Sequence, residues 1–177
     1  MDVFEKLFIH NRECQVIICK RCQFAVNPAS VKGHIERKHK TVSRQQCAQI
    51  VTFIGRLSQV AQEPARVRYP DAHSPPILGI PVHDDGLRCV FQIEGQPCNY
   101  TCRERSGIQK HCKNHGYQNP RRRGRPDKDT DRSRLWVERQ TCQELFKTGL
   151  WRRLFPVRVT PTPGEAATVD IITKAND

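Results

Sequence analysis

The chain has 177 residues, only 37% of them hydrophobic, and a mean hydropathy of −0.67, which together argue against one large core. Its 30 Lys and Arg outnumber 18 Asp and Glu, and the net charge of +12 favours a polyanionic partner such as nucleic acid. No apolar run approaches the roughly 20 residues of a membrane span and no signal peptide is recognisable, so we expect no membrane partner and a reducing compartment.

Residues 14–40 are predicted to form a first zinc finger. The pattern C-x2-C-x11-H-x4-H, one residue short of the usual spacing, places four ligands at Cys19, Cys22, His34 and His39. Two thiolates on a tight turn and two imidazoles on one helical face suit a tetrahedral zinc ion. Asn27 and Pro28 fit the start of the helix, and Val31 fits its buried face. Cys14 is interpreted as a bystander.

Residues 42–62 are predicted to form an amphipathic helix. Ser43 and Gln46 match a capping box, and apolar residues then recur with a period near 3.6. We expect the helix to pack on the first finger, with a dimerisation helix as the alternative. Residues 64–86 contain five prolines and are predicted to be a linker or an extended arm.

Residues 87–118 are predicted to form a second zinc finger. The pattern C-x8-C-x12-H-x3-H places its ligands at Cys89, Cys98, His111 and His115. The gap between the two cysteines is unusually long, but residues 94–97 can bulge out as a hairpin tip without moving the thiols. An alternative ligand set uses Cys102 in place of Cys89. Tyr100 follows the second cysteine by two residues, as Phe24 does in the first finger, which indicates an internal repeat.

Residues 119–134 are basic, then mixed in charge, and are predicted to be disordered around a core that resembles an AT-hook. Such a core lays arginines into a narrow A·T minor groove, and it also resembles a nuclear-import signal. Residues 135–157 regain aromatic side chains and are predicted to form one more helix or a small docking element. The expected fold is small α+β: two Cys2His2 (ββα) fingers joined by a helix and a Pro-rich linker, with partly disordered basic and C-terminal segments.

The excess positive charge lies in two stretches. Residues 20–44 carry a net +6 and residues 103–125 a net +7, so the rest of the chain is nearly neutral. Phosphate contacts are expected from Lys32, Arg37, Lys38, Lys40, Lys110, Arg121, Arg122, Arg123 and Arg125. The helix positions that usually read bases include Gly33 and Gly107, which offer no base contact. The long linker also argues against base-by-base reading by adjacent fingers.

The predicted function is that of a zinc-binding C2H2-finger protein that holds two Zn²⁺ ions, binds duplex DNA and acts in the nucleus as a transcriptional regulator. The alternative is a zinc-stabilised protein-interaction module without sequence-specific DNA binding. We expect neither an enzyme nor a small-molecule substrate, because each Cys2His2 set is closed to further ligands. The sequence also lacks a phosphate-binding glycine loop and a nucleophile elbow.

Four stretches together resemble a fungal C2H2 zinc-finger domain family named after the orsellinic acid biosynthesis cluster protein D. They comprise residues 16–26, 81–89, 116–126 and 136–146. The resemblance covers roughly residues 10–157 and is specific as a combination. It implies C2H2 fingers and no catalytic activity, while the long gap between Cys89 and Cys98 departs from the family pattern.

Overall fold

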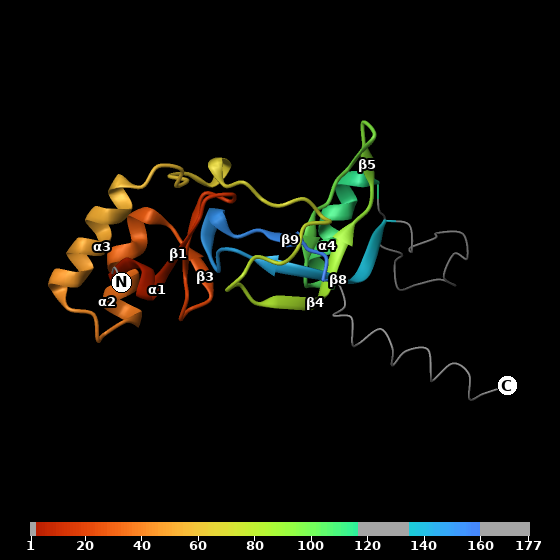
Figure 1. Ribbon diagram of the computed structural model, residues 1–177. Helices are drawn as coiled ribbons and strands as arrows, with labels where there is room; N and C mark the ends of the chain where they lie inside the picture. The colour runs from red at the N-terminus through yellow and green to blue at the C-terminus, as the bar shows by residue number, and fades with distance from the viewer. Residues whose placement is uncertain (1–2, 117–134, 160–177) are drawn as a thin grey trace, which may run out of the picture.

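The computed structural model describes residues 3–116 and 135–159, so the predicted AT-hook-like segment 119–134 lies outside the described residues. Figure 1 shows helices and a small sheet from the N-terminal part at one end, and a barrel at the other end. Within the described residues, no helix is long and apolar enough to cross a membrane. The chain is a small mixed α/β protein, in agreement with the broad fold class predicted above.

A three-stranded antiparallel sheet forms the centre of the N-terminal part. Its order is β1 (Phe8–Asn11), β2 (Val16–Cys19), β3 (Phe24–Val26). Every residue of β2 is buried, because its alternate side chains enter different cores on the two faces of the sheet. The first finger predicted at 14–40 omits β1 and the preceding helix α1 (Val3–Leu7), which belong to the same packed unit.

Helices cover one face of this sheet. A short 3-10 helix, η1 (Pro28–Ser30), leads into α2 (Val31–Lys38), and the Asn27 side chain accepts a hydrogen bond from the Ala29 amide, as predicted for the cap. Val31 is fully buried, also as predicted. The longest helix, α3 (Arg44–Arg56), packs on α1 and α2 and closes this core.

Helix α3 begins as predicted and ends earlier than predicted. Ser43 and Gln46 form a capping box in which each side chain accepts a hydrogen bond from the other residue's amide. The predicted helix ran to residue 62, but the chain leaves the helix after Arg56. It then crosses to the other face of the sheet, where the Ala61 amide donates to the Gln15 carbonyl and the Ala61 side chain is buried. This pairing with the loop after β1 replaces the last expected helical turn.

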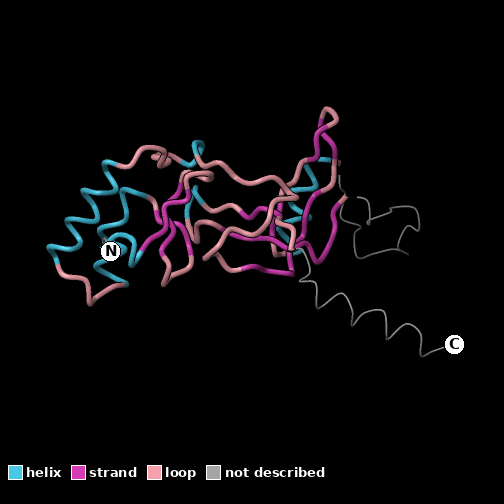
Figure 2. The backbone as a smooth tube through the Cα atoms, in the orientation of Figure 1, coloured by secondary structure: helices cyan, strands magenta, loops and turns pink. Residues whose placement is uncertain are grey.

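The segment 64–86 is packed against the molecule, and its prediction as a linker is wrong for most of its length. Figure 2 shows it running as a loop along the molecule from α3 to β4. It contains a 3-10 turn, η2 (Pro64–Arg66), and three buried side chains at Val67, Ile77 and Ile80. Its prolines make the backbone extended. These apolar residues nevertheless hold the segment on the outer face of the sheet, which is the face opposite to the helices.

Four strands close a small barrel in the order β4-β7-β9-β8. They are β4 (Val82–Cys89), β7 (Thr101–Cys102), β8 (Trp136–Glu144) and β9 (Leu154–Pro156). A hairpin of β5 (Gln92–Ile93) and β6 (Gln96–Pro97) follows β4. Helix α4 (Arg105–Cys112) and the 3-10 turns η3 (Lys113–His115) and η5 (Gly149–Trp151) complete this part.

The additional helix predicted at 135–157 is wrong, because this segment forms β8, η5 and β9. The alternative of a docking element fits better. Leu145, Phe146, Phe155 and Val157 are buried in the core on the outer face of the N-terminal sheet. The Ala25 amide of β3 donates to the Leu145 carbonyl at 2.6 Å. The two Cys/His segments therefore belong to one packed body.

Candidate metal centres

The first predicted ligand set comes together at one end of the N-terminal sheet. Cys19 ends β2, Cys22 lies in the turn before β3, His34 is on α2 and His39 follows its last turn. The His39 Nε2 atom lies 3.2 Å from Cys19 Sγ, 3.6 Å from Cys22 Sγ and 3.2 Å from His34 Nε2. All four donor atoms lie within 4.8 Å of one another.

Burial keeps Cys19, His34 and His39 uncharged when no metal is bound. It lowers the pKa of His34 to about 4, and the nearby His39, Arg37 and Lys38 act in the same direction. Burial also lowers the pKa of His39 and raises the pKa of the Cys19 thiol. Both imidazoles are therefore neutral at pH 7 and carry a free lone pair, whereas the Cys19 thiol needs a bound cation to ionise.

The donor set fits zinc. With Zn–S bonds of about 2.3 Å and Zn–N bonds of about 2.0–2.1 Å, a tetrahedral ion separates its ligand atoms by about 3.3–3.8 Å, close to the observed distances. The Nδ1 atom of His39 is buried and makes no hydrogen bond to a described residue. Burying that nitrogen costs about 1–3 kcal/mol, a cost that metal binding at Nε2 can offset. Zinc would here bind two thiolates and two neutral imidazoles and release the thiol protons.

The second predicted set also comes together. Its four donor atoms, from Cys89, Cys98, His111 and His115, again lie within 4.8 Å of one another. His111 Nε2 lies 3.2 Å from both Cys98 Sγ and His115 Nε2. Burial lowers the pKa of His111, as does the neighbouring His115, and burial raises the pKa of the Cys89 thiol to about 12. The chemistry of this set therefore matches that of the first.

The hairpin β5-β6 accounts for the long gap between the two cysteines. Glu94 and Gly95 form its tip, with φ angles of 49° and 77°. The Cys98 amide donates to the Phe91 carbonyl at 2.8 Å, which closes the base of the hairpin and returns the chain to Cys89. The predicted bulge at 94–97 is confirmed, and the thiols meet despite the inserted residues.

The alternative ligand Cys102 lies outside this group. Its thiol donates to the Glu104 carbonyl at 3.3 Å and lies against Gly107 on the first turn of α4. Cys112 and Ile108 are fully buried beside Cys89, and Cys14 is buried in the core on the outer face of the sheet. The structure thus separates the eight predicted ligands from the cysteines interpreted as bystanders or core residues.

Aromatic rings support the histidines of both centres. Phe24 meets His34 edge-on, with 5.5 Å between the ring centroids. In the second centre, Tyr100 stacks on His111 at 3.9 Å and Phe91 stacks on His115 at 4.4 Å. These contacts restrict the rotation of the imidazoles. Phe91 has no place in the metal-binding pattern, so its role could not be predicted from spacing.

The cations predicted to contact phosphate differ in their surroundings. The side chains of Lys32, Arg37, Lys38 and Lys40 are exposed on and after α2, and none forms a salt bridge with a described residue. Lys110 is exposed on α4. The predicted contacts Arg121, Arg122, Arg123 and Arg125 lie outside the described residues.

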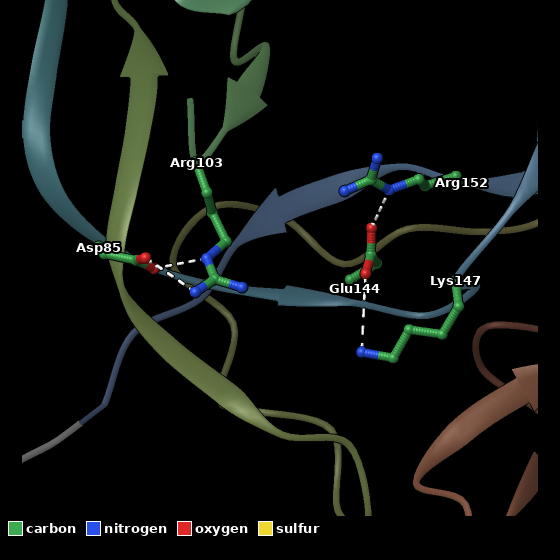
Figure 3. Close-up of polar contacts among 5 residues, drawn as sticks. All are labelled: Asp85, Arg103, Glu144, Lys147 and Arg152. Atoms are coloured by element: carbon green, nitrogen blue, oxygen red, sulfur yellow. Dashed lines mark hydrogen bonds and ion pairs between the residues drawn. The ribbon is translucent and has the colours of Figure 1, made fainter. Parts of the chain in front are cut away.

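Two further basic residues of the second segment are already paired. Arg103 binds both carboxylate oxygens of Asp85, at 2.6 and 2.8 Å, as Figure 3 shows, and Arg105 lies 3.4 Å from Glu138. The bidentate contact lowers the pKa of Asp85. Part of the positive charge counted in residues 103–125 is therefore balanced locally.

Comparison with known proteins identifies the family. The family model described as "Orsellinic acid/F9775 biosynthesis cluster protein D" matches residues 6–117. The chain belongs to this family. A curated relative with the same description, from Emericella nidulans, is 34% identical over 85 residues, which are 48% of this chain and 16% of the relative. The chain thus matches only a small part of that relative's length. No solved structure matches the chain.

The part that matches the orsellinic acid cluster D family contains both candidate metal centres. It begins before β1 and ends just after η3, so it includes all eight donor residues. It leaves out β8 and β9, which complete the barrel, and the buried residues of 145–157, which pack on the outer face of the N-terminal sheet.

Proposed function

We propose that the chain is a zinc-stabilised nucleic-acid-binding protein, in which each Cys/His cluster and its helix act as a Cys2His2 finger. The zinc ions are structural in this proposal, since four protein donors leave no position for a substrate or a reactive water. We accordingly propose no catalytic activity, and we propose that the protein works in the nucleus on duplex DNA.

The basic surface around α2, whose cations form no salt bridge with a described residue, is the observation that carries this proposal. Lys32, Arg37, Lys38 and Lys40 are exposed, and the first metal centre holds the helix that carries most of them. A cluster of free cations on a rigid element attracts the phosphates of DNA and releases their counterions.

Binding through α2 would depend little on base sequence. A Cβ atom at Gly33 would lie 3.1 Å from the Arg37 guanidinium, so this arginine already lies over one of the usual base-reading positions. Ser30 is small, and Gly33 has no side chain to offer a base. We therefore expect contacts mainly to the phosphates, with similar affinity for unrelated duplexes.

A salt series on the zinc-loaded protein tests the proposal. The triple variant R37Q/K38Q/K40Q should weaken duplex binding and reduce the slope of log K against log salt by about 0.9 for each lost phosphate contact. The matched control R66Q/R105Q/K147Q removes three exposed charges that are already paired with Glu63, Glu138 and Glu144. The control should retain nearly the full slope. Absent binding, or equal losses in both variants, would reject the proposal.

A protein-interaction module is the second candidate function. It is favoured by a cleft beside the second metal centre, whose rim bears a highly exposed leucine. The two candidate functions use different parts of the molecule and can coexist.

A further inference from the structure

A cleft of about 1010 Å³ lies between the start of the 64–86 segment, the α4 region and the residues around η5. Its lining includes Tyr69, Tyr100, Arg103, Leu150, Arg152 and Arg153. The ligand His111 also lines the cleft, beneath the stacked Tyr100 ring. The second metal centre therefore helps to shape one wall.

Leu150 is the main apolar feature of the rim. Its side chain is 93% exposed, because Gly149, with a φ of 72°, turns the chain so that Leu150 projects from η5. The neighbouring Trp151 packs inward against Phe146. An exposed apolar side chain at the rim of a cleft is well placed to bury surface against a partner.

The arginines of the cleft are only partly occupied. Arg152 uses its Nε atom to bind Glu144 at 2.5 Å, while Lys147 lies 3.7 Å from the same carboxylate, as Figure 3 shows. Arg153 lies over the Tyr69 ring, 4.7 Å from its centroid, and forms no salt bridge with a described residue. The terminal amino groups of Arg152 and the guanidinium of Arg153 therefore remain available to one or two carboxylates.

The acidic residues of the cleft select against a polyanion. Asp85 and Glu104 both line it, and although Asp85 is bound by Arg103, Glu104 forms no salt bridge with a described residue. A continuous phosphate backbone would meet this carboxylate. A peptide can instead place one carboxylate at Arg153 and an apolar side chain against Leu150 and Leu154, so the mixed lining fits a peptide better than DNA.

We propose that this cleft is a docking site for an extended peptide of a partner protein, in which a leucine-sized apolar residue stands next to a carboxylate. Leu150 and the Tyr100 ring would contact the apolar residue, while Arg153 and the terminal amino groups of Arg152 would bind the carboxylate. This inference deepens the protein-interaction candidate and is independent of DNA binding through α2.

Selection from a display library of short random peptides on the zinc-loaded full chain tests the proposal. We expect enriched peptides to share an acidic residue beside a large aliphatic one. The variants L150S and R153Q should each weaken the best peptide by about tenfold, because a few anchors dominate such interfaces. Both residues are exposed, so the melting temperature should stay nearly unchanged.

Matched variants control for exposure and charge. L78S removes a leucine that is 86% exposed outside the cleft, and R56Q removes an exposed arginine at the end of α3. Both should bind the peptide within about twofold of the unmodified chain. No enrichment, enrichment of basic peptides, or equal losses in L78S and L150S would overturn the proposal. A loss of duplex DNA binding in R153Q without any peptide binding would overturn it and assign the cleft to nucleic acid.

Discussion

At the scale of single residues, the second metal centre depends on Cys89. This side chain is fully buried at the end of β4, where burial raises the pKa of its thiol to about 12. A thiol of such high pKa is a poor nucleophile and becomes a thiolate only beside a strong cation. Cys102, in contrast, already uses its thiol as a donor to the Glu104 carbonyl.

The zinc content of two serine variants should separate these cysteines. C89S should lower the bound zinc from the proposed two ions per chain toward one, because a neutral hydroxyl is a much weaker zinc ligand than a thiolate. C102S should keep both ions. Metal analysis after dialysis against metal-free buffer measures the difference, and loss of zinc from C102S with retention in C89S would contradict the assignment.

The eight donors could be predicted from the sequence because each pair of histidines is spaced for one face of a helix, and a pair of cysteines lies shortly before that helix. Their aromatic supports could not all be predicted in this way. Phe91 precedes an inserted hairpin, so no fixed spacing relates it to His115, on which it stacks. Likewise, Arg103 lies in the turn between β7 and α4 and pairs with Asp85 of β4. This pairing depends on tertiary structure, so the charge count from the sequence treated Arg103 as unpaired.

At the scale of elements, the barrel depends on close contact between β4 and β8. The register between the two strands shifts on both sides of Gly86. A Cβ atom at Gly86 would lie 2.3 Å from the Gln140 carbonyl oxygen and 2.8 Å from Cys142 Sγ. Both distances are far below van der Waals contact, so only glycine allows β8 to approach at this point.

Alanine substitutions at two glycines should therefore have opposite effects. G86A should destabilise the chain by about 2–4 kcal/mol, because the methyl group forces β4 and β8 apart. G55A, in α3, meets no atom within 4 Å and should be neutral or stabilise by up to about 1 kcal/mol through helix propensity. Chemical denaturation of zinc-loaded protein measures both, and equal stabilities of G86A and G55A would contradict the proposed strand contact.

The helices were predicted better than the strands. The cap and apolar period of α3 lie within one stretch of sequence, so its start could be identified directly. Strand β8 instead pairs with β4, more than 40 residues earlier in the chain, and its central residues are polar because they face outward. The sequence of β8 contains aromatic and polar residues, but no nearby pattern indicates that β4 is its partner strand.

At the scale of the whole molecule, one buried glutamine ties the 64–86 segment to the C-terminal strands. The side chain of Gln143 is fully buried. Its oxygen accepts from the Ile77 amide at 2.7 Å, and its nitrogen donates to the carbonyls of Ile77 and Ile80 at 3.1 and 2.8 Å. These bonds hold a proline-rich stretch that forms no long regular element of its own.

Replacing Gln143 by leucine should release this stretch. Q143L leaves the Ile77 amide and the Ile80 carbonyl without partners, while the Ile77 carbonyl still accepts from the Ile80 amide. At about 1–3 kcal/mol for each unpaired group, we expect a loss of at least about 2 kcal/mol in the free energy of unfolding. Amide hydrogen exchange should show faster exchange around Ile77 and Ile80. Q92L, on the exposed hairpin strand β5, is the control and should change neither quantity; unchanged exchange in Q143L would contradict the role of the glutamine.

Because β2 is buried on both faces of the sheet, the choice of boundaries for a recombinant fragment of this family matters. Residues 145–157 cover the outer face of the N-terminal sheet, yet the family match stops at residue 117. A recombinant fragment trimmed to the matched span would lose Leu145, Phe146, Phe155 and Val157 from this core, and β3 would lose the partner of its Ala25 amide. Such a fragment is expected to aggregate while still carrying every metal ligand, so expression boundaries should extend through β9.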